Sequence, residues 1–95
     1  RSSEQVFQIG GNTYRNVILR LGPETEELIV VGAHYDAWDE LPGADDNASG
    51  VAGLIELTRM LSQTQLPMGL ELVAYTLVDA GPDSYHAPIV AAFAD

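Results

Sequence analysis

His34 and Asp36 stand two residues apart, directly after a run of apolar residues. Side chains at this spacing on a strand point to the same side, so the imidazole and the carboxylate can lie together. A neutral imidazole at a strand end can ligate a divalent cation, and a neighbouring carboxylate can orient it. Taken alone, however, a His-x-Asp pair at a strand end more often lies on the surface without a function.

Asp45 and Asp46 form a second acidic group, within the segment PGADDNASG. They precede residues with a helical pattern, and the positive end of the helix dipole favours negative charge there. One of these carboxylates could bridge two metal ions through its two oxygens. The simpler interpretation is a capping sequence, in which Asp46 or Asn47 caps the helix. Trp38, on the polar loop between the two groups, either packs against the domain or walls a pocket.

The elements that position these groups follow the order strand, loop, helix, strand. Residues 27–33 contain four consecutive apolar residues, typical of a strand buried on both faces. Residues 48–63 have apolar side chains at near 3.6-residue spacing and predict a helix, and residues 70–78 predict another strand. We expect the two strands to be parallel, with the helix as a right-handed crossover on one face. The acidic loop then lies beyond the strand ends, where α/β sheets bind ligands.

The amino-terminal part of the chain adds strands to this unit. Residues 13–21 are rich in β-branched and aromatic side chains and predict a strand. The short connection 22–26 favours an antiparallel hairpin between residues 13–21 and 27–33. The predicted fold class is therefore α/β, a mixed and partly parallel sheet with an N-terminal hairpin and one main crossover helix. A sheet covered on both faces needs helices on each, so a single good helix indicates an incomplete domain.

Composition limits the classes of function. The 95 residues suffice for one small domain, and 14 acidic residues against 4 basic ones give a net charge of -10. This balance argues against nucleic acid and anionic membranes as partners. No cysteine is present, which excludes disulfides, thiolate zinc sites and thiol nucleophiles. No apolar run approaches the roughly 18 residues of a membrane span.

From about residue 14 to residue 77 the sequence resembles the co-catalytic di-zinc aminopeptidases, a family that includes the animal glutaminyl cyclases. The resemblance is sharpest in VVGAHYDAW, PGADDNASGVAGLIEL and LELVAYTL. It implies a three-layer aminopeptidase-like fold and a zinc-dependent exopeptidase that acts on peptide N-termini, with two zinc ions in the intact site. By position, it implies that His34 ligates one zinc, Asp46 bridges both zincs and Asp36 orients His34. It also implies a cis peptide bond between Asp46 and Asn47.

The sequence departs from this family pattern after Leu77. The family strand ends in two glutamates, the first a general base and the second a zinc ligand, and Val78 and Asp79 stand at these places. Valine cannot accept a proton, whereas Asp79 can still ligate a metal with a shorter side chain. His86 has no matching motif around it and is interpreted as a loop histidine. The family's remaining ligands, an aspartate and a histidine, would lie downstream of residue 95.

Two explanations compete for this departure: a truncated or frame-shifted enzyme, and a genuine short relative that has lost catalysis. We expect one partial catalytic domain over residues 1–95, with residues 80–95 unassigned, no measurable aminopeptidase activity and weak zinc binding. The alternatives are a glutaminyl cyclase-like acyltransferase fragment and a non-catalytic α/β remnant or interaction module. The resemblance slightly favours a secreted or periplasmic location and leaves a cytoplasmic one open.

Overall fold

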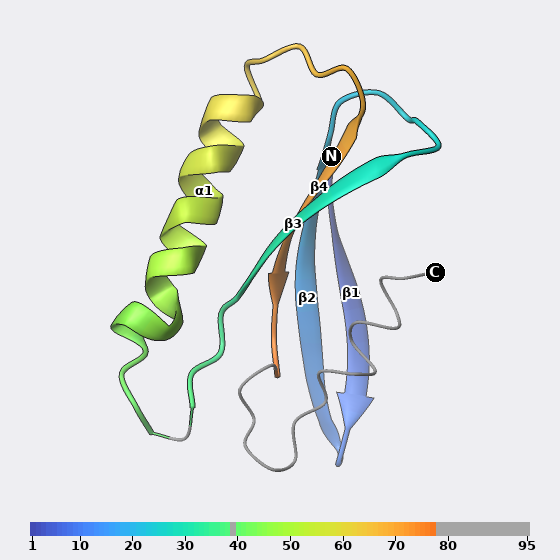
Figure 1. The fold of residues 1–95 in the computed structure, drawn as a ribbon. Helices are drawn as coiled ribbons and strands as arrows, with labels where there is room; N and C mark the ends of the chain where they lie inside the picture. Colours follow the sequence, from blue (N-terminus) through green and yellow to red (C-terminus); the bar gives the residue numbers. More distant parts are fainter. Residues whose placement is uncertain (39, 78–95) are drawn as a thin grey trace.

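The computed structural model describes residues 1–38 and 40–77, which form one mixed sheet with a helix beside it (Figure 1). The strand order in the sheet is β1-β2-β4-β3. A π-helical turn η1 precedes helix α1, which packs against β3 and β4. The α/β fold class is therefore as predicted. The elements are β1 (Ser2–Ile9), β2 (Asn12–Leu21), β3 (Leu28–His34), η1 (Ala44–Ala48), α1 (Ser49–Leu61) and β4 (Gly69–Tyr75).

Strands β3 and β4 are parallel, in register from Leu28 opposite Gly69 to His34 opposite Tyr75. This confirms the predicted strand–helix–strand crossover. β4 lies between β2 and β3 and contributes the buried apolar core, which consists of Leu70, Leu72 and Val73. β4 ends three residues before the predicted limit at residue 78, and Leu77 takes a φ of 61°, in the left-handed region that ends an extended strand.

The predicted hairpin between residues 13–21 and 27–33 is wrong. β2 pairs antiparallel with β4, from Val17 opposite Ala74 to Leu21 opposite Leu70, so β4 separates β2 from β3. The N-terminal hairpin instead joins β1 to β2 across Gly10 and Gly11, whose φ angles are 57° and 81°. Two adjacent glycines supply the two positive φ values that match a tight turn to the strand twist. Connection length alone could not reveal the strand inserted beside β2.

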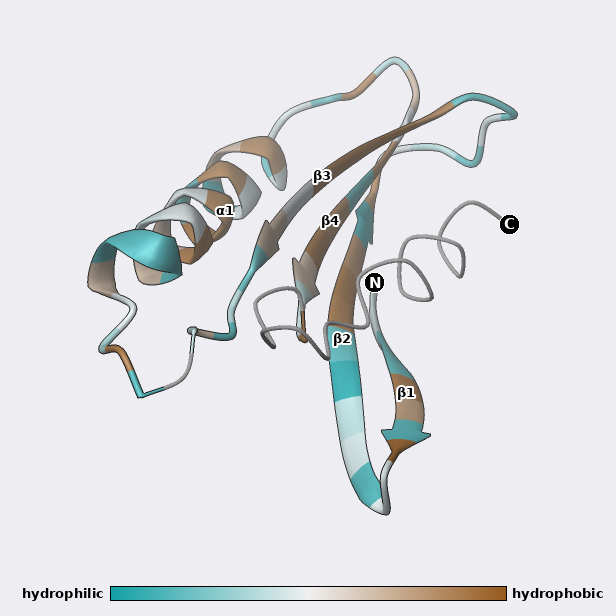
Figure 2. Cartoon of the chain, turned by 60° about the horizontal axis from the view of Figure 1, so that its bottom comes forward, coloured by the Kyte–Doolittle hydropathy of each residue, from teal (hydrophilic) through white to brown (hydrophobic). Residues whose placement is uncertain are grey.

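The sheet has a buried hydrogen-bond network on its central strands, whereas apolar side chains on the edge strand β3 are exposed. Asn16 on β2 is fully buried; its Oδ1 accepts a hydrogen bond from the Thr76 N–H (2.8 Å), and its Nδ2 donates to Gln5 (2.9 Å). By contrast, Ile29 and Val30 on β3 are 50% and 44% exposed. Figure 2 shows that β3 and β4 are strongly hydrophobic. Over residues 1–38 and 40–77 one helix covers one face of the sheet, and no helix in these ranges combines the length and apolarity needed to cross a membrane.

Candidate metal centre

His34 is the last residue of β3, and the chain after it stays fixed to the sheet. The Tyr35 backbone N–H donates to the Tyr75 carbonyl oxygen (2.8 Å), and the Tyr35 hydroxyl donates to the Arg15 carbonyl oxygen (2.6 Å). These bonds tie the segment from His34 to Asp36 to β4 and β2. Sequence reasoning missed this role of Tyr35. The signal was its position between His34 and Asp36, because alternating side chains turn the middle one to the opposite side.

The imidazole of His34 lies between two aspartates. Its Nδ1 is 3.3 Å from Asp36 Oδ1 and 3.1 Å from the Asp36 carbonyl oxygen, and its Nε2 is 3.1 Å from Asp46 Oδ1. A neutral imidazole carries one N–H. If this N–H is on Nδ1, it points toward Asp36 and leaves the lone pair of Nε2 facing Asp46. A group placed behind a histidine ring in this way fixes which nitrogen is free to ligate a metal. The predicted convergence of these three residues is confirmed.

Asp46 reaches His34 from the turn η1, which is not a regular helix. Asp46 and Asn47 have non-helical backbone angles, and the peptide bond between them is cis, as the family resemblance implies. The Asp46 side chain is 70% exposed, whereas those of His34 and Asp36 are 18% and 15% exposed. Asn47 Oδ1 accepts a hydrogen bond from the Gly50 N–H (3.1 Å), so Asn47 rather than Asp46 makes the predicted capping contact.

The geometry of His34 and Asp46 fits two ligands of one zinc ion. Ligand atoms about 2.0–2.2 Å from a tetrahedral zinc lie about 3.3–3.6 Å apart, which is close to the 3.1 Å between Nε2 and Oδ1. Nitrogen and carboxylate oxygen are both donors that zinc accepts. Catalytic zinc sites use three protein ligands, and residues 1–38 and 40–77 hold no group of three such side chains placed for one metal ion. The described residues therefore offer part of a zinc site.

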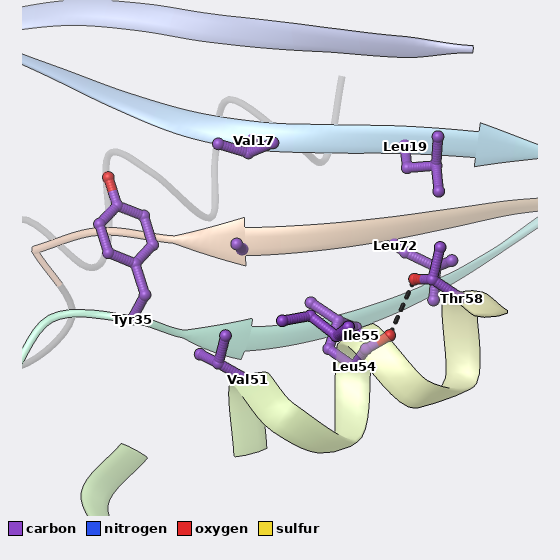
Figure 3. Close-up of a pocket in the computed structure, with 9 residues that line it drawn as sticks. Val17, Leu19, Tyr35, Val51, Leu54, Ile55, Thr58 and Leu72 are labelled. Atoms are coloured by element: carbon purple, nitrogen blue, oxygen red, sulfur yellow. Dashed lines mark hydrogen bonds between the residues drawn. The ribbon is translucent and has the colours of Figure 1, made fainter. Parts of the chain in front are cut away.

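The other predicted site residues stand apart from this cluster. Val78, Asp79 and His86 lie outside the described residues. Trp38 lies on the loop and is 46% exposed, which argues against packing into the body of the domain. A cavity of about 380 Å³ lies between α1 and the sheet, and its lining is apolar apart from Tyr35 and Thr58 (Figure 3). Both hydroxyls donate to backbone carbonyl oxygens, so the cavity presents no metal ligand.

Comparison with known proteins settles the relationship. Residues 16–81 match the model for peptidase family M28. The chain belongs to peptidase family M28. An uncharacterized protein of Escherichia coli K12, YfbL, is 48% identical over 83 residues, which cover 79% of this chain and 26% of that protein. Membership in this family agrees with the resemblance that the motifs of the sequence indicate.

Solved structures of known enzymes superpose on this chain, among them a glutaminyl cyclase and a zinc aminopeptidase. A glutaminyl cyclase from Porphyromonas gingivalis superposes with a TM-score of 0.76 at 34% identity, over 92% of this chain and 33% of the cyclase. A zinc aminopeptidase from Bacillus subtilis superposes with a TM-score of 0.63 at 29% identity, over 70% of this chain and 17% of that enzyme. The chain thus spans about a quarter of the E. coli relative, 33% of this cyclase and 17% of this aminopeptidase.

Proposed function

We propose that this chain carries the first part of the zinc site of an M28 exopeptidase, in which His34 and Asp46 ligate zinc. The observation that carries the proposal is the 3.1 Å approach of His34 Nε2 to Asp46 Oδ1, with Nδ1 facing Asp36 on the other side of the ring. Zinc bound there would act as a Lewis acid on the scissile carbonyl of a bound peptide.

The protein residues divide the work of preparing this site. His34 Nδ1 faces the backbone carbonyl oxygen of Asp36 at 3.1 Å and its carboxylate Oδ1 at 3.3 Å, and an N–H held there would keep the Nε2 lone pair toward the ion. Asp46, which is 70% exposed, has a second carboxylate oxygen that can serve a second ion and so bridge the pair. Asp79 is the candidate for a third ligand, and Trp38 is the candidate wall of the substrate pocket. The substrates proposed are peptide N-termini, and the proposed location is secreted or periplasmic.

The chain's own activity is a separate part of the proposal. Val78 stands where the family resemblance places the general base, and general-base assistance typically contributes about 10²–10⁴ in rate. We therefore propose that this 95-residue chain binds zinc weakly and does not turn over amino-acid anilides.

The two histidines of the sequence provide a matched test of the zinc site. Zinc affinity is measured by competition with a chromogenic chelator for the chain, for His34→Ala and for His86→Ala. The expected result is a loss of about tenfold or more for His34→Ala and no change for His86→Ala. Equal losses in the two variants, or a loss confined to His86→Ala, would contradict the assignment.

A second candidate activity is acyl transfer of the glutaminyl cyclase kind, favoured by the 34% identity and the TM-score of 0.76 to the P. gingivalis cyclase. It would use the same His34 and Asp46 with one zinc. Zinc stoichiometry separates the candidates, because the aminopeptidase proposal needs a carboxylate shared by two ions. A chain that binds no zinc at all would instead support the non-catalytic α/β module.

A further inference from the structure

The side-chain amide of Asn47 connects the two segments that carry the proposed zinc ligands. Its Nδ2 donates a hydrogen bond to the backbone carbonyl oxygen of His34 (3.2 Å), at the end of β3. Its Oδ1 accepts one from the backbone N–H of Gly50 (3.1 Å), in the first turn of α1. One side chain therefore ties the His34 strand end to the helix start, with Asp46 as its neighbour in the chain.

The Asn47 amide packs directly against the backbone of Gly50. A Cβ built on Gly50 would lie 2.4 Å from Asn47 Oδ1 and 2.5 Å from Nδ2, which is far inside contact distance. Gly53, one turn further along α1, has nothing within 4 Å of the same built atom. Glycine in a helix costs about 0.5–1 kcal/mol relative to alanine. Packing explains why a glycine stands at position 50 despite this cost: only the absence of a side chain leaves room for the Asn47 amide.

We propose that Asn47 is a positioning residue that sets the separation of His34 and Asp46, and that Gly50 is required to let it do so. The inference rests on the proposed zinc site. In this role the Asn47 amide bonds two backbone groups of the chain rather than the ion or the substrate. It acts by fixing the carbonyl of His34 and the turn that carries Asp46, so that Nε2 and Oδ1 face each other across 3.1 Å.

Two alanine substitutions in the same helix test the requirement for space. Gly53→Ala raises helix propensity and should not lower the melting temperature, whereas in Gly50→Ala the same gain of about 0.5–1 kcal/mol offsets the loss of the two Asn47 hydrogen bonds, so its melting temperature should change little. Only Gly50→Ala displaces the amide, and it is expected to raise the zinc Kd by about tenfold or more, as is typical when partners behind a metal ligand are lost. The Kd of Gly53→Ala should equal that of the parent chain. Equal zinc Kd values for the two variants would overturn the proposal.

Asn47→Asp tests the bond to His34, because charge attraction and loss of this bond predict opposite changes in zinc affinity. The variant keeps an acceptor for the Gly50 N–H but sets a carboxylate oxygen against the His34 carbonyl oxygen. General attraction between charges would make an extra acid tighten zinc binding, whereas loss of the positioning bond weakens it. The expected result is a several-fold higher zinc Kd. A lower or unchanged Kd would contradict the positioning role.

A metal-free measurement separates failure of this inference from failure of the zinc site. If the parent chain binds no zinc, the proposed function is wrong. The positioning role is then decided by the ¹⁵N shifts of the His34 ring. These shifts should move in Gly50→Ala and stay in place in Gly53→Ala. Identical ring shifts in both variants would overturn the positioning role, with or without zinc binding.

Discussion

Asn16 and Asn47 use the same side-chain amide in two regions of the molecule that differ in burial. Asn16 is fully buried in the sheet and bonds the Thr76 N–H and the Gln5 side chain. Asn47 is half-buried in the loop and bonds the His34 carbonyl oxygen and the Gly50 N–H. Removing the hydrogen-bond partner of a buried polar group lowers the stability of the protein strongly. When the polar group is more exposed, water takes the place of the lost partner and the cost is smaller. The sheet amide therefore serves stability, and the loop amide serves the geometry of the site.

The largest effect expected from this difference is on stability. Asn16→Ala should lower the free energy of unfolding by about 2–4 kcal/mol, because it leaves the buried Thr76 N–H without its acceptor and opens a cavity. Asn47→Ala should cost about 1 kcal/mol or less. Urea denaturation followed by circular dichroism measures both. Similar losses of unfolding free energy in Asn16→Ala and Asn47→Ala would contradict the difference proposed between the two amides.

A smaller effect is expected where the loop is fixed to the sheet. Tyr35→Phe removes the hydrogen bond to the Arg15 carbonyl oxygen and should destabilise the chain by about 0.5–1.5 kcal/mol. Tyr14→Phe, in the hairpin where Tyr14 stacks on Phe7, is the matched control and should change stability less. Because Tyr35 lies between His34 and Asp36, Tyr35→Phe should also raise the zinc Kd. A zinc Kd raised equally by Tyr14→Phe would contradict this.

A further small effect concerns pH. Burial raises the pKa of Tyr75 above its ordinary value near 10, and the nearby Glu71 carboxylate raises it further. The folded state thus disfavours ionised Tyr75, so its contribution to stability is full below pH 10 and is lost as pH rises above that value. Tyr75→Phe should remove this part of the decline in unfolding free energy as pH rises above 10. An unchanged decline in the variant would show that Tyr75 does not cause it.

The smallest expected effect is on catalysis. Introducing acids with Val78→Glu and Asp79→Glu should yield no measurable hydrolysis of amino-acid anilides, because the further aspartate and histidine ligands that the family resemblance implies are not matched within these 95 residues. Turnover by the double variant would mean that the base was the main missing part. Turnover by the unmodified chain would mean that another residue serves as the base.

Much of the site was predictable from the sequence, because its motif is local. The spacing of His34 and Asp36 and the segment around Asp46 predicted a convergence that the structure confirms. The strand order was not predictable in this way. The insertion of β4 between β2 and β3 depends on contacts between residues 17–21 and 70–74, which leave no mark on the short connection 22–26. The bond from Asn47 to His34 was missed for a similar reason, since an Asn before a helix already has an explanation as a cap.

The most direct test of the zinc site is ¹⁵N NMR of the two histidine rings during zinc titration, with His86→Ala used for assignment. The expected result is that the Nε2 resonance of His34 moves on zinc addition while Nδ1 stays protonated beside Asp36. Zinc-dependent change at His86 alone, or coordination through Nδ1 of His34, would contradict the account.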